Sequence, residues 1–201
     1  MEAKRLIAWV LAVILTAISA VLYFKESHYW YNYLVFGMLF LFDNLSHARK
    51  NKTTLDLIFK KKYKKFLVLF FWLFVLGMII ELIGHFWLGF WYYKFINPPS
   101  EHIIANIIGF LTYPLVLMSF REMYNFIHSF IKNLVLSVVL SMILGITIWE
   151  IPTLHTKDWV YNFPYISLEI FGLNIVVISG WTILILSPRL VYKLVDIFYK
   201  K

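Results

Sequence analysis

The chain has 201 residues, of which 61% are hydrophobic and only 15% are charged. Soluble domains average about 45–50% apolar and about 25% charged residues, so this composition excludes an ordinary water-soluble globule. The formal net charge is +8, and the chain contains no Cys, which excludes disulfides, thiolate metal sites and a cysteine nucleophile.

Six stretches have the length and the apolar composition of membrane-spanning helices, because a hydrocarbon core about 30 Å thick requires about 20 residues of helix. No linker divides the chain, so we expect one integral membrane domain, residues 1–201, of the all-α class. It is a polytopic helical bundle whose six transmembrane helices pair as three hairpins. The expected spans are 6–24, 29–46, 66–90, 102–120, 131–150 and 165–187.

The first span, 6–24, also has features of a secretory signal. Lys4 and Arg5 precede it, and small residues occur at Ala17 and Ser19. Because the run is long enough to cross a bilayer and further helices follow directly, we interpret it as a retained transmembrane helix.

The connection 47–65 is a basic loop that carries eight Lys and Arg residues and no long apolar run. Lys and Arg are enriched in cytoplasmic loops of membrane proteins. With the N-terminus inside, sixteen of the nineteen Lys and Arg residues lie on the inner side, and only Lys25, Lys94 and Lys157 lie outside. We therefore expect a multi-pass protein of the cell membrane with both termini in the cytoplasm.

The positive charge does not require a nucleic-acid partner. Anionic headgroups attract basic residues near the inner surface by about 1 kcal/mol each, so membrane lipids, with anionic headgroups at the basic loop, are the expected partners. The tail 189–201 places Leu190, Leu194 and Phe198 on one helical side. This spacing predicts an interfacial helix on the inner leaflet.

Aromatic residues concentrate in the three expected outer turns, at 29–33, 90–95 and 159–165. One interpretation is an aromatic belt, because Trp and Tyr favour the headgroup level of a bilayer. The other interpretation is contact with a bound ligand. The residues that we expect to bind a substrate are Trp91, Tyr92, Tyr93, Asn106, Trp159 and Tyr161.

The second and third hairpins share a sequence pattern. Glu81 precedes Trp91 by ten residues in the second hairpin. Glu150 precedes Trp159 by nine residues in the third. Two hairpins with one orientation and one pattern predict a parallel internal repeat.

An acid and a base share one face of the third span. Spacings of three and four residues place Gly77, Glu81, Gly84 and His85 together on that face. An ionisable group inside a bilayer costs roughly 2.5 to 3.5 kcal/mol on insertion scales, so this face should meet another helix or a cavity. A structural hydrogen bond between Glu81 and His85 is one interpretation, and a carboxyl group that transfers a proton is the other.

Further polar residues form two groups. The expected topology collects a set in the outer half with Glu81: His85, His102, Asn106, Glu150, His155 and Glu169. A second set lies at the inner ends of the second and fourth spans, where we expect an interfacial structural role: Asp43, Asn44, His47, Arg121 and Glu122. Asp43 and His47 should lie close enough to the interface to reach water.

The motifs favour acid–base chemistry over other reactions. No metal-binding motif, phosphate-binding loop or serine-protease pattern occurs, so we expect neither a metal nor a cofactor. A protonated carboxyl group can donate to an electron-rich double bond, and aromatic faces can stabilise the resulting cation. The expected catalytic residues are Glu81 as the acid, His85 as its orienting partner, and Glu150 or Glu169 as the second carboxylate.

The run ELIGHFWLGFWYY, Glu81 to Tyr93, followed by Tyr113 and Pro114, resembles polytopic carotenoid-modifying membrane proteins, namely bacterioruberin-precursor hydratases and lycopene-cyclase-like domains. The resemblance covers residues 80–120 and implies a polyprenoid or carotenoid-like lipid as substrate. A small transporter or membrane-complex subunit, with the same residues along a polar pathway, is the alternative. A structural membrane protein without a catalytic site is another, and the sequence leaves homo-oligomerisation open.

Overall fold

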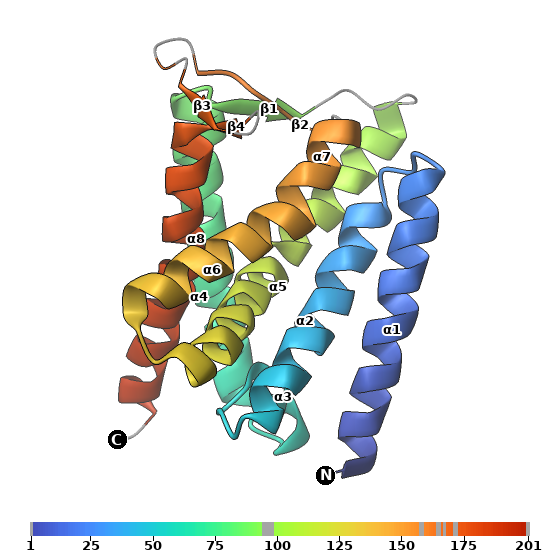
Figure 1. Ribbon diagram of the computed structural model, residues 1–201. Helices are drawn as coiled ribbons and strands as arrows, with labels where there is room; N and C mark the ends of the chain where they lie inside the picture. The colour runs from blue at the N-terminus through green and yellow to red at the C-terminus, as the bar shows by residue number, and fades with distance from the viewer. Residues whose placement is uncertain are drawn as a thin grey trace.

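The computed structural model describes residues 2–93, 99–156, 159–163, 166, 168–170 and 173–199, and most of them are helical (Figure 1). The helices are α1 (Glu2–Phe24), α2 (Trp30–Ala48), α3 (Thr54–Phe59), α4 (Tyr63–Glu81), α5 (Pro99–Ile131), α6 (Leu134–Gly145), α7 (Ile151–Thr156) and α8 (Ile175–Phe198). Two π-helical turns, η1 (Leu82–Trp87) and η2 (Ile146–Glu150), continue α4 and join α6 to α7. The strands are β1 (Trp91–Tyr93), β2 (Trp159–Tyr161), β3 (Glu169–Ile170) and β4 (Leu173–Asn174). The all-α class is confirmed, with two short antiparallel ribbons, β1–β2 and β3–β4, added to it.

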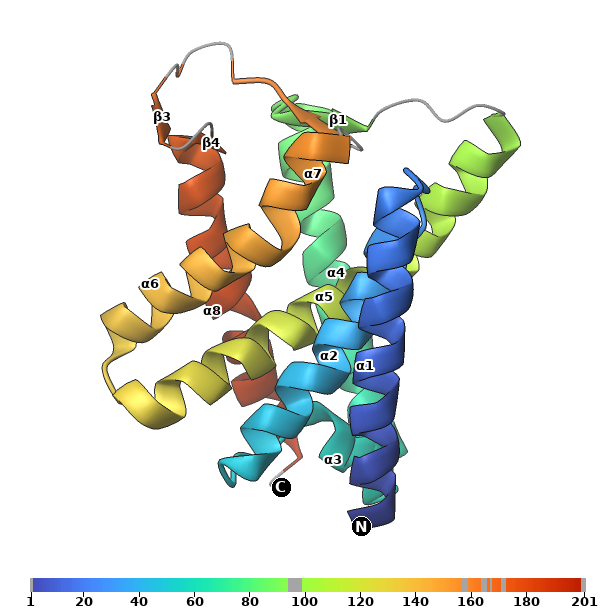
Figure 2. The ribbon, with the colours of Figure 1, turned by 45° about the vertical axis from the view of Figure 1, so that its right-hand side comes forward.

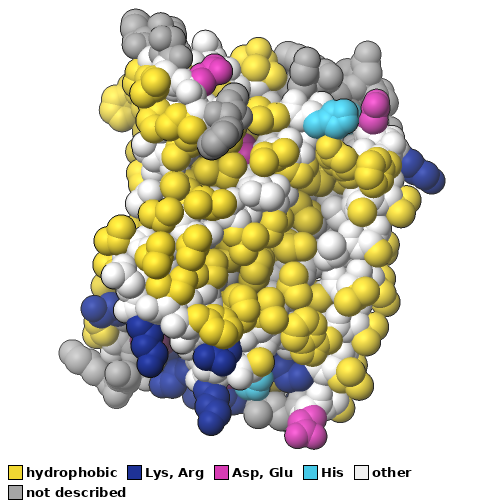
Figure 3. Space-filling model, in the orientation of Figure 1, with side chains coloured by type: hydrophobic (Ala, Val, Ile, Leu, Met, Phe, Trp, Pro, Cys, Tyr) yellow, Lys and Arg dark blue, Asp and Glu magenta, His cyan; other side chains and the backbone are white. Residues whose placement is uncertain are grey.

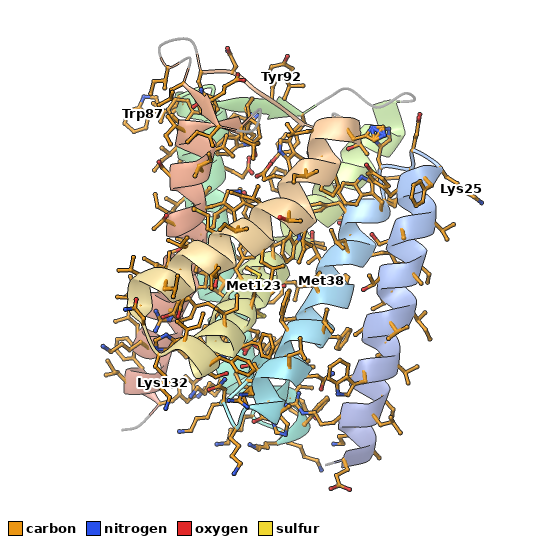
Figure 4. The ribbon with its side chains drawn as sticks, in the orientation of Figure 1. Lys25, Met38, Trp87, Tyr92, Met123 and Lys132 are labelled. Carbon is orange, nitrogen blue, oxygen red and sulfur yellow. The ribbon has the colours of Figure 1, made fainter. Side chains whose placement is uncertain are left out.

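Four helices in the described part are long and apolar enough to cross a membrane: Glu2–Phe24, Tyr63–Trp87, Leu134–Thr156 and Ile175–Phe198. The two remaining expected spans correspond to α2 and α5, which do not meet both criteria. These helices pack together at the centre of the bundle, where Met38 and Met123 are buried (Figure 4). A helix surrounded by protein can carry more polar residues than one that faces lipid.

The two ends of the bundle differ in charge. Both termini and α3 lie at one end, the basic end, and β1–β4 lie at the other, the strand end (Figures 1 and 2). Lys and Arg side chains gather at the basic end, and hydrophobic side chains cover the middle of the visible face (Figure 3). Lys25 lies at the strand end and Lys132 toward the basic end (Figure 4).

A buried arginine joins three helices at the basic end. Arg5 of α1 is 8% exposed. Its guanidinium donates to the Asp43 carboxylate of α2 at 2.5 Å and to the Asp56 carboxylate of α3 at 2.5 Å. It also donates to the Asn44 side chain at 3.2 Å and to the Thr53 hydroxyl at 2.9 Å. The three helix ends are therefore held by one cation.

A third buried carboxylate, on α5, binds α3, which in turn contacts α8. Glu122 of α5 accepts from the Thr54 backbone N–H at 3.0 Å and from the Thr54 hydroxyl at 2.7 Å. Arg121 donates to the same carboxylate, and the hydroxyls of Thr54 and Tyr192 share a hydrogen bond. Thr54 thus links α3 to α5 and to α8.

The expectation that Asp43 reaches water is wrong, because its side chain is fully buried, as are those of Asn44 and Glu122 beside it. The reason is α3, which lies within the expected basic loop 47–65 and packs beneath the bundle. Its N-terminal residues supply donors to both carboxylates, including the Leu55 backbone N–H to Asp43 at 2.7 Å.

The last helix begins later than expected. The sequence placed the sixth span at 165–187 and a separate interfacial helix at 189–201, but α8 runs without interruption from Ile175 to Phe198. It starts at Asn174, whose side chain accepts from the Val176 backbone N–H at 2.9 Å and caps the helix. The expected interfacial helix is therefore the second half of α8.

We predict that Arg5→Met destabilises the protein strongly. The substitution leaves the Asp43 and Asp56 carboxylates buried without their shared cation, and breaking a buried ion pair costs about 3–5 kcal/mol. Thermal unfolding in detergent, followed by circular dichroism, measures the loss. The control is Lys4→Met, which makes the same charge change at the exposed neighbour. Equal unfolding midpoints for the two variants would contradict the role given to Arg5.

Candidate functional site

A cavity of about 670 Å³ lies inside the half of the bundle nearest the strand end. This volume is within the range of roughly 300–1,000 Å³ that ligand pockets occupy. Side chains of α2, α4, α5, η2 and α8 form its walls, and the β1–β2 ribbon contributes four aromatic residues across the strand end. Two carboxyl groups of the described residues face this largely apolar space: Glu81 and Glu150.

Glu81 is the last residue of α4 and is 1% exposed. Its Oε1 accepts hydrogen bonds from the Tyr93 hydroxyl at 2.7 Å and from the Tyr113 hydroxyl at 2.8 Å. Its Oε2 accepts from the indole N–H of Trp91 at 3.3 Å. A buried carboxyl group is costly unless it is hydrogen-bonded, and here donors from β1 and α5 satisfy both oxygens.

Glu150 is the last residue of η2 and is 5% exposed. Its Oε1 accepts from the Tyr161 hydroxyl at 2.8 Å and from the Trp181 indole N–H at 3.1 Å. The indole of Trp159 donates in turn to the Tyr161 hydroxyl at 3.0 Å. Oε2 is buried and has no hydrogen-bond partner among the described residues. Glu150 therefore keeps one oxygen that can carry a proton.

The two strand tyrosines remain protonated donors. Burial raises the pKa of Tyr93 well above its ordinary value, and the adjacent Glu81 raises it further. Burial also raises the pKa of Tyr161 well above its ordinary value, and the adjacent Glu150 raises it further. Each phenol therefore keeps the proton that it donates to its carboxylate.

The strands place the two carboxylates in equivalent settings. β1 and β2 are antiparallel, with Trp91 opposite Tyr161. Tyr93 lies opposite Trp159. A two-fold rotation through the middle of this ribbon exchanges the two Trp residues and the two Tyr residues. The Trp and Tyr positions that the two hairpins share in sequence are thus related by this two-fold in the ribbon.

The second helix of each hairpin, α5 or α8, also supplies a hydrogen-bond donor to the carboxylate of that hairpin. Tyr113 of α5 contacts Glu81, and Trp181 of α8 contacts Glu150. A glycine on the outgoing helix makes room for each ring. A Cβ on Gly77 would lie 2.6 Å from the Tyr113 ring, and a Cβ on Gly145 would lie 2.3 Å from the Trp181 ring. Both glycines therefore permit close packing of helix against aromatic ring.

Both carboxylates adjoin a π-helical turn. Glu81 immediately precedes η1, and Glu150 ends η2. A π-helical turn inserts an extra residue into a helix and is frequent at functional sites. Gly145 consequently precedes Glu150 by five residues, whereas Gly77 precedes Glu81 by four.

Several residues of the site were not expected from the sequence. Trp181 was not singled out, and Tyr113 entered only through the family resemblance. Tyr31 of α2 also lines the cavity and interacts electrostatically with both carboxylates. The sequence signal that could have identified Tyr113 and Trp181 is their spacing from the two acids. Tyr113 follows Glu81 by 32 residues, and Trp181 follows Glu150 by 31.

His85 does not pair with Glu81. Its Nδ1 lies 2.6 Å from the Trp91 carbonyl oxygen, so its ring fixes the start of β1. The expected orienting contact is replaced by the donors from Trp91, Tyr93 and Tyr113. His85 therefore positions the strand that carries two of these donors.

Two other expected site residues lie away from the cavity. Tyr92 is 51% exposed and points away from the bundle (Figure 4), because successive side chains of a strand face opposite sides. Glu169 is exposed in β3, since α8 begins after this segment and not before it. Trp91, Tyr93, Trp159 and Tyr161 do line the cavity. Asn106 belongs to α5, but its side chain lies outside the described residues.

We predict that Gly145→Ala destabilises the protein by about 1–3 kcal/mol, because the added methyl group overlaps the Trp181 ring. The matched control is Gly180→Ala in α8, where a Cβ meets no atom within 4 Å. That control should be neutral or stabilising by up to about 1 kcal/mol. Thermal unfolding of the two variants under the same conditions makes the comparison, and a lower midpoint for Gly180→Ala would refute it.

The geometry limits the chemistry of the site. Two carboxyl groups can exchange protons with a ligand, and aromatic faces can stabilise a cation by roughly 0.5 to 2 kcal/mol each. Within the described ranges, no three His, Asp or Glu side chains are grouped to hold a metal ion.

Comparison with protein-family models, curated proteins and solved structures finds no match for this chain.

Proposed function

We propose that the protein binds a polyprenoid or carotenoid-like lipid in the cavity and modifies it by proton transfer. The observation that carries the proposal is that Glu81 and Glu150, both buried, face one apolar cavity lined by aromatic rings. A site that takes an apolar molecule and offers two carboxyl groups fits a double bond better than it fits a polar substrate. The resemblance of residues 80–120 to carotenoid-modifying proteins agrees with this class.

The proposed reaction needs no external oxidant or reductant. A carboxylic acid gives its proton to one carbon of a double bond, whose π electrons form the new C–H bond. The neighbouring carbon becomes a cation that the surrounding rings stabilise. The second carboxylate removes a proton from an adjacent carbon, and the electrons of that C–H bond form a shifted double bond. Proton exchange between the carboxyl groups then restores the starting state.

The hydrogen bonds favour Glu150 as the acid and Glu81 as the base. Three donors point at the oxygens of Glu81, and donors stabilise the charged form of a carboxylate. Glu150 has donors on Oε1 alone, so Oε2 can hold the proton. This assignment reverses the roles expected from the sequence, where Glu81 was the acid.

The packing below the cavity supports binding over transport. Between the cavity and the basic end, the bundle is filled by side chains that are at most 1% exposed: Leu69, Leu73, Met123 and Ile185. A transporter requires a polar or hydrated pathway, and this apolar layer opposes one.

We also propose that α2 and α5 cross the membrane with the other four helices, and that both termini lie in the cytoplasm. The gathering of Lys and Arg at the basic end supports this orientation (Figure 3). Single cysteines test it, because the chain has none of its own. Lys25→Cys should react with a membrane-impermeant maleimide on intact cells, and Lys132→Cys only after lysis. If Lys132→Cys reacts on intact cells and Lys25→Cys reacts only after lysis, the topology is the opposite of the one proposed.

We expect Glu81→Gln and Glu150→Gln each to abolish the reaction. Glutamine keeps the shape of the side chain but cannot exchange the proton, and loss of a general acid or base costs roughly 10²–10⁴-fold in rate. The assay is lipid extraction and mass spectrometry of isoprenoid-producing cells that express each variant. Glu169→Gln, an exposed carboxylate, is the matched control and should retain wild-type products. Identical lipid profiles for wild type and both cavity variants would sink the proposal.

A further inference from the structure

The exposed residues in the cavity wall are confined to two helices. Among the described lining residues, five are exposed: Ile79, Ile83, Leu88, Ser179 and Ile183. Ile79 belongs to α4, Ile83 to η1, which continues α4, and Leu88 follows η1; Ser179 and Ile183 belong to α8. Because these residues line the cavity and are also exposed on the surface, the wall of the cavity is one side chain thick where α4 and α8 adjoin.

The same two helices are held together at the basic end. Lys65 near the start of α4 forms an ion pair with Asp196 near the end of α8. The exposed wall residues lie about three turns or more from this pair along each helix. The contact therefore fixes the helices below this thin wall and leaves their cavity-lining halves free of that constraint.

Small residues keep this wall thin on the α8 side. Gly180 lines the cavity, and a Cβ built on it meets no atom within 4 Å. Ser179 precedes it and is exposed. The side chains that flank this gap are aliphatic, with Ile79 48% and Ile183 60% exposed. Aliphatic side chains exposed on membrane-crossing helices face hydrocarbon.

We propose that the gap between α4 and α8 is a lateral portal through which a linear isoprenoid chain enters from the lipid, with its tail remaining between Ile79 and Ile183. This inference rests on the proposed function. The β1–β2 ribbon covers the strand end, and beside it the rings of Phe90 and Phe163 pack at a tilt of 51° with their centroids 5.0 Å apart. An apolar chain that enters sideways keeps its tail in hydrocarbon and brings only its reactive segment to the carboxylates.

The test is photolabelling with geranylgeraniol that carries a diazirine at its hydrocarbon end, on protein reconstituted in phosphatidylcholine vesicles. Mass spectrometry should find adducts within 79–83 and 179–183 that excess unlabelled geranylgeraniol suppresses. Gly180→Leu fills the gap and should reduce these adducts at least about tenfold. Gly180→Ala, the matched control, should retain them.

A second variant covers the case in which Gly180→Leu does not fold. Ile183→Trp enlarges an exposed side chain at the mouth and should reduce labelling in the same way. If competed adducts persist unchanged in a folded portal variant, the portal is overturned while binding in the cavity stands. If wild type shows no competed adduct at any cavity residue, the proposed ligand class fails and the portal with it.

Discussion

The site depends on one constraint: a carboxyl group removed from water must receive hydrogen bonds from the protein. Glu81 and Glu150 meet this need with phenol and indole donors, which are apolar enough to share the cavity with a lipid and still donate. Each carboxylate binds a strand residue and a residue of a returning helix. Satisfying the acids therefore also fixes the ribbon across the bundle and determines the shape of the cavity.

At the basic end, the buried carboxylates receive hydrogen bonds from guanidinium groups and from backbone N–H groups. Asp43 accepts from Arg5 and from the Leu55 backbone N–H, and Oε1 of Glu122 accepts from Arg121 and from Thr54. Guanidinium groups carry full charge, so this network neutralises its acids and leaves them fixed as ion pairs. The phenols and indoles at the strand end are neutral donors, so they hydrogen-bond their carboxyl groups without adding a positive charge. The apolar layer between the ends keeps the two chemistries apart.

The sequence predicted the helical class, the polar face at Glu81 and the relation between the second and third hairpins, because periodicity and spacing are local properties. It misplaced the start of α8, since the apolar run from 165 onward does not distinguish a strand hairpin from a helix. It also missed the burial of Asp43 and Glu122, which depends on α3 folding back beneath the bundle. The partners Tyr113 and Trp181 are more than thirty residues from their carboxylates, and only the packed helices reveal those contacts.

The symmetric register of the β1–β2 ribbon has a consequence for the two halves of the chamber. The two hairpins bring a glycine, an acid and a Trp-x-Tyr strand to matching places around the cavity, and α2 adds Tyr31 and Asn32 to its wall. Joining the halves in a single polypeptide removes the requirement that they stay identical. Glu81 has donors on both of its oxygens, while Oε2 of Glu150 has none among the described residues, so two acids in matching places of one polypeptide differ in their hydrogen bonds.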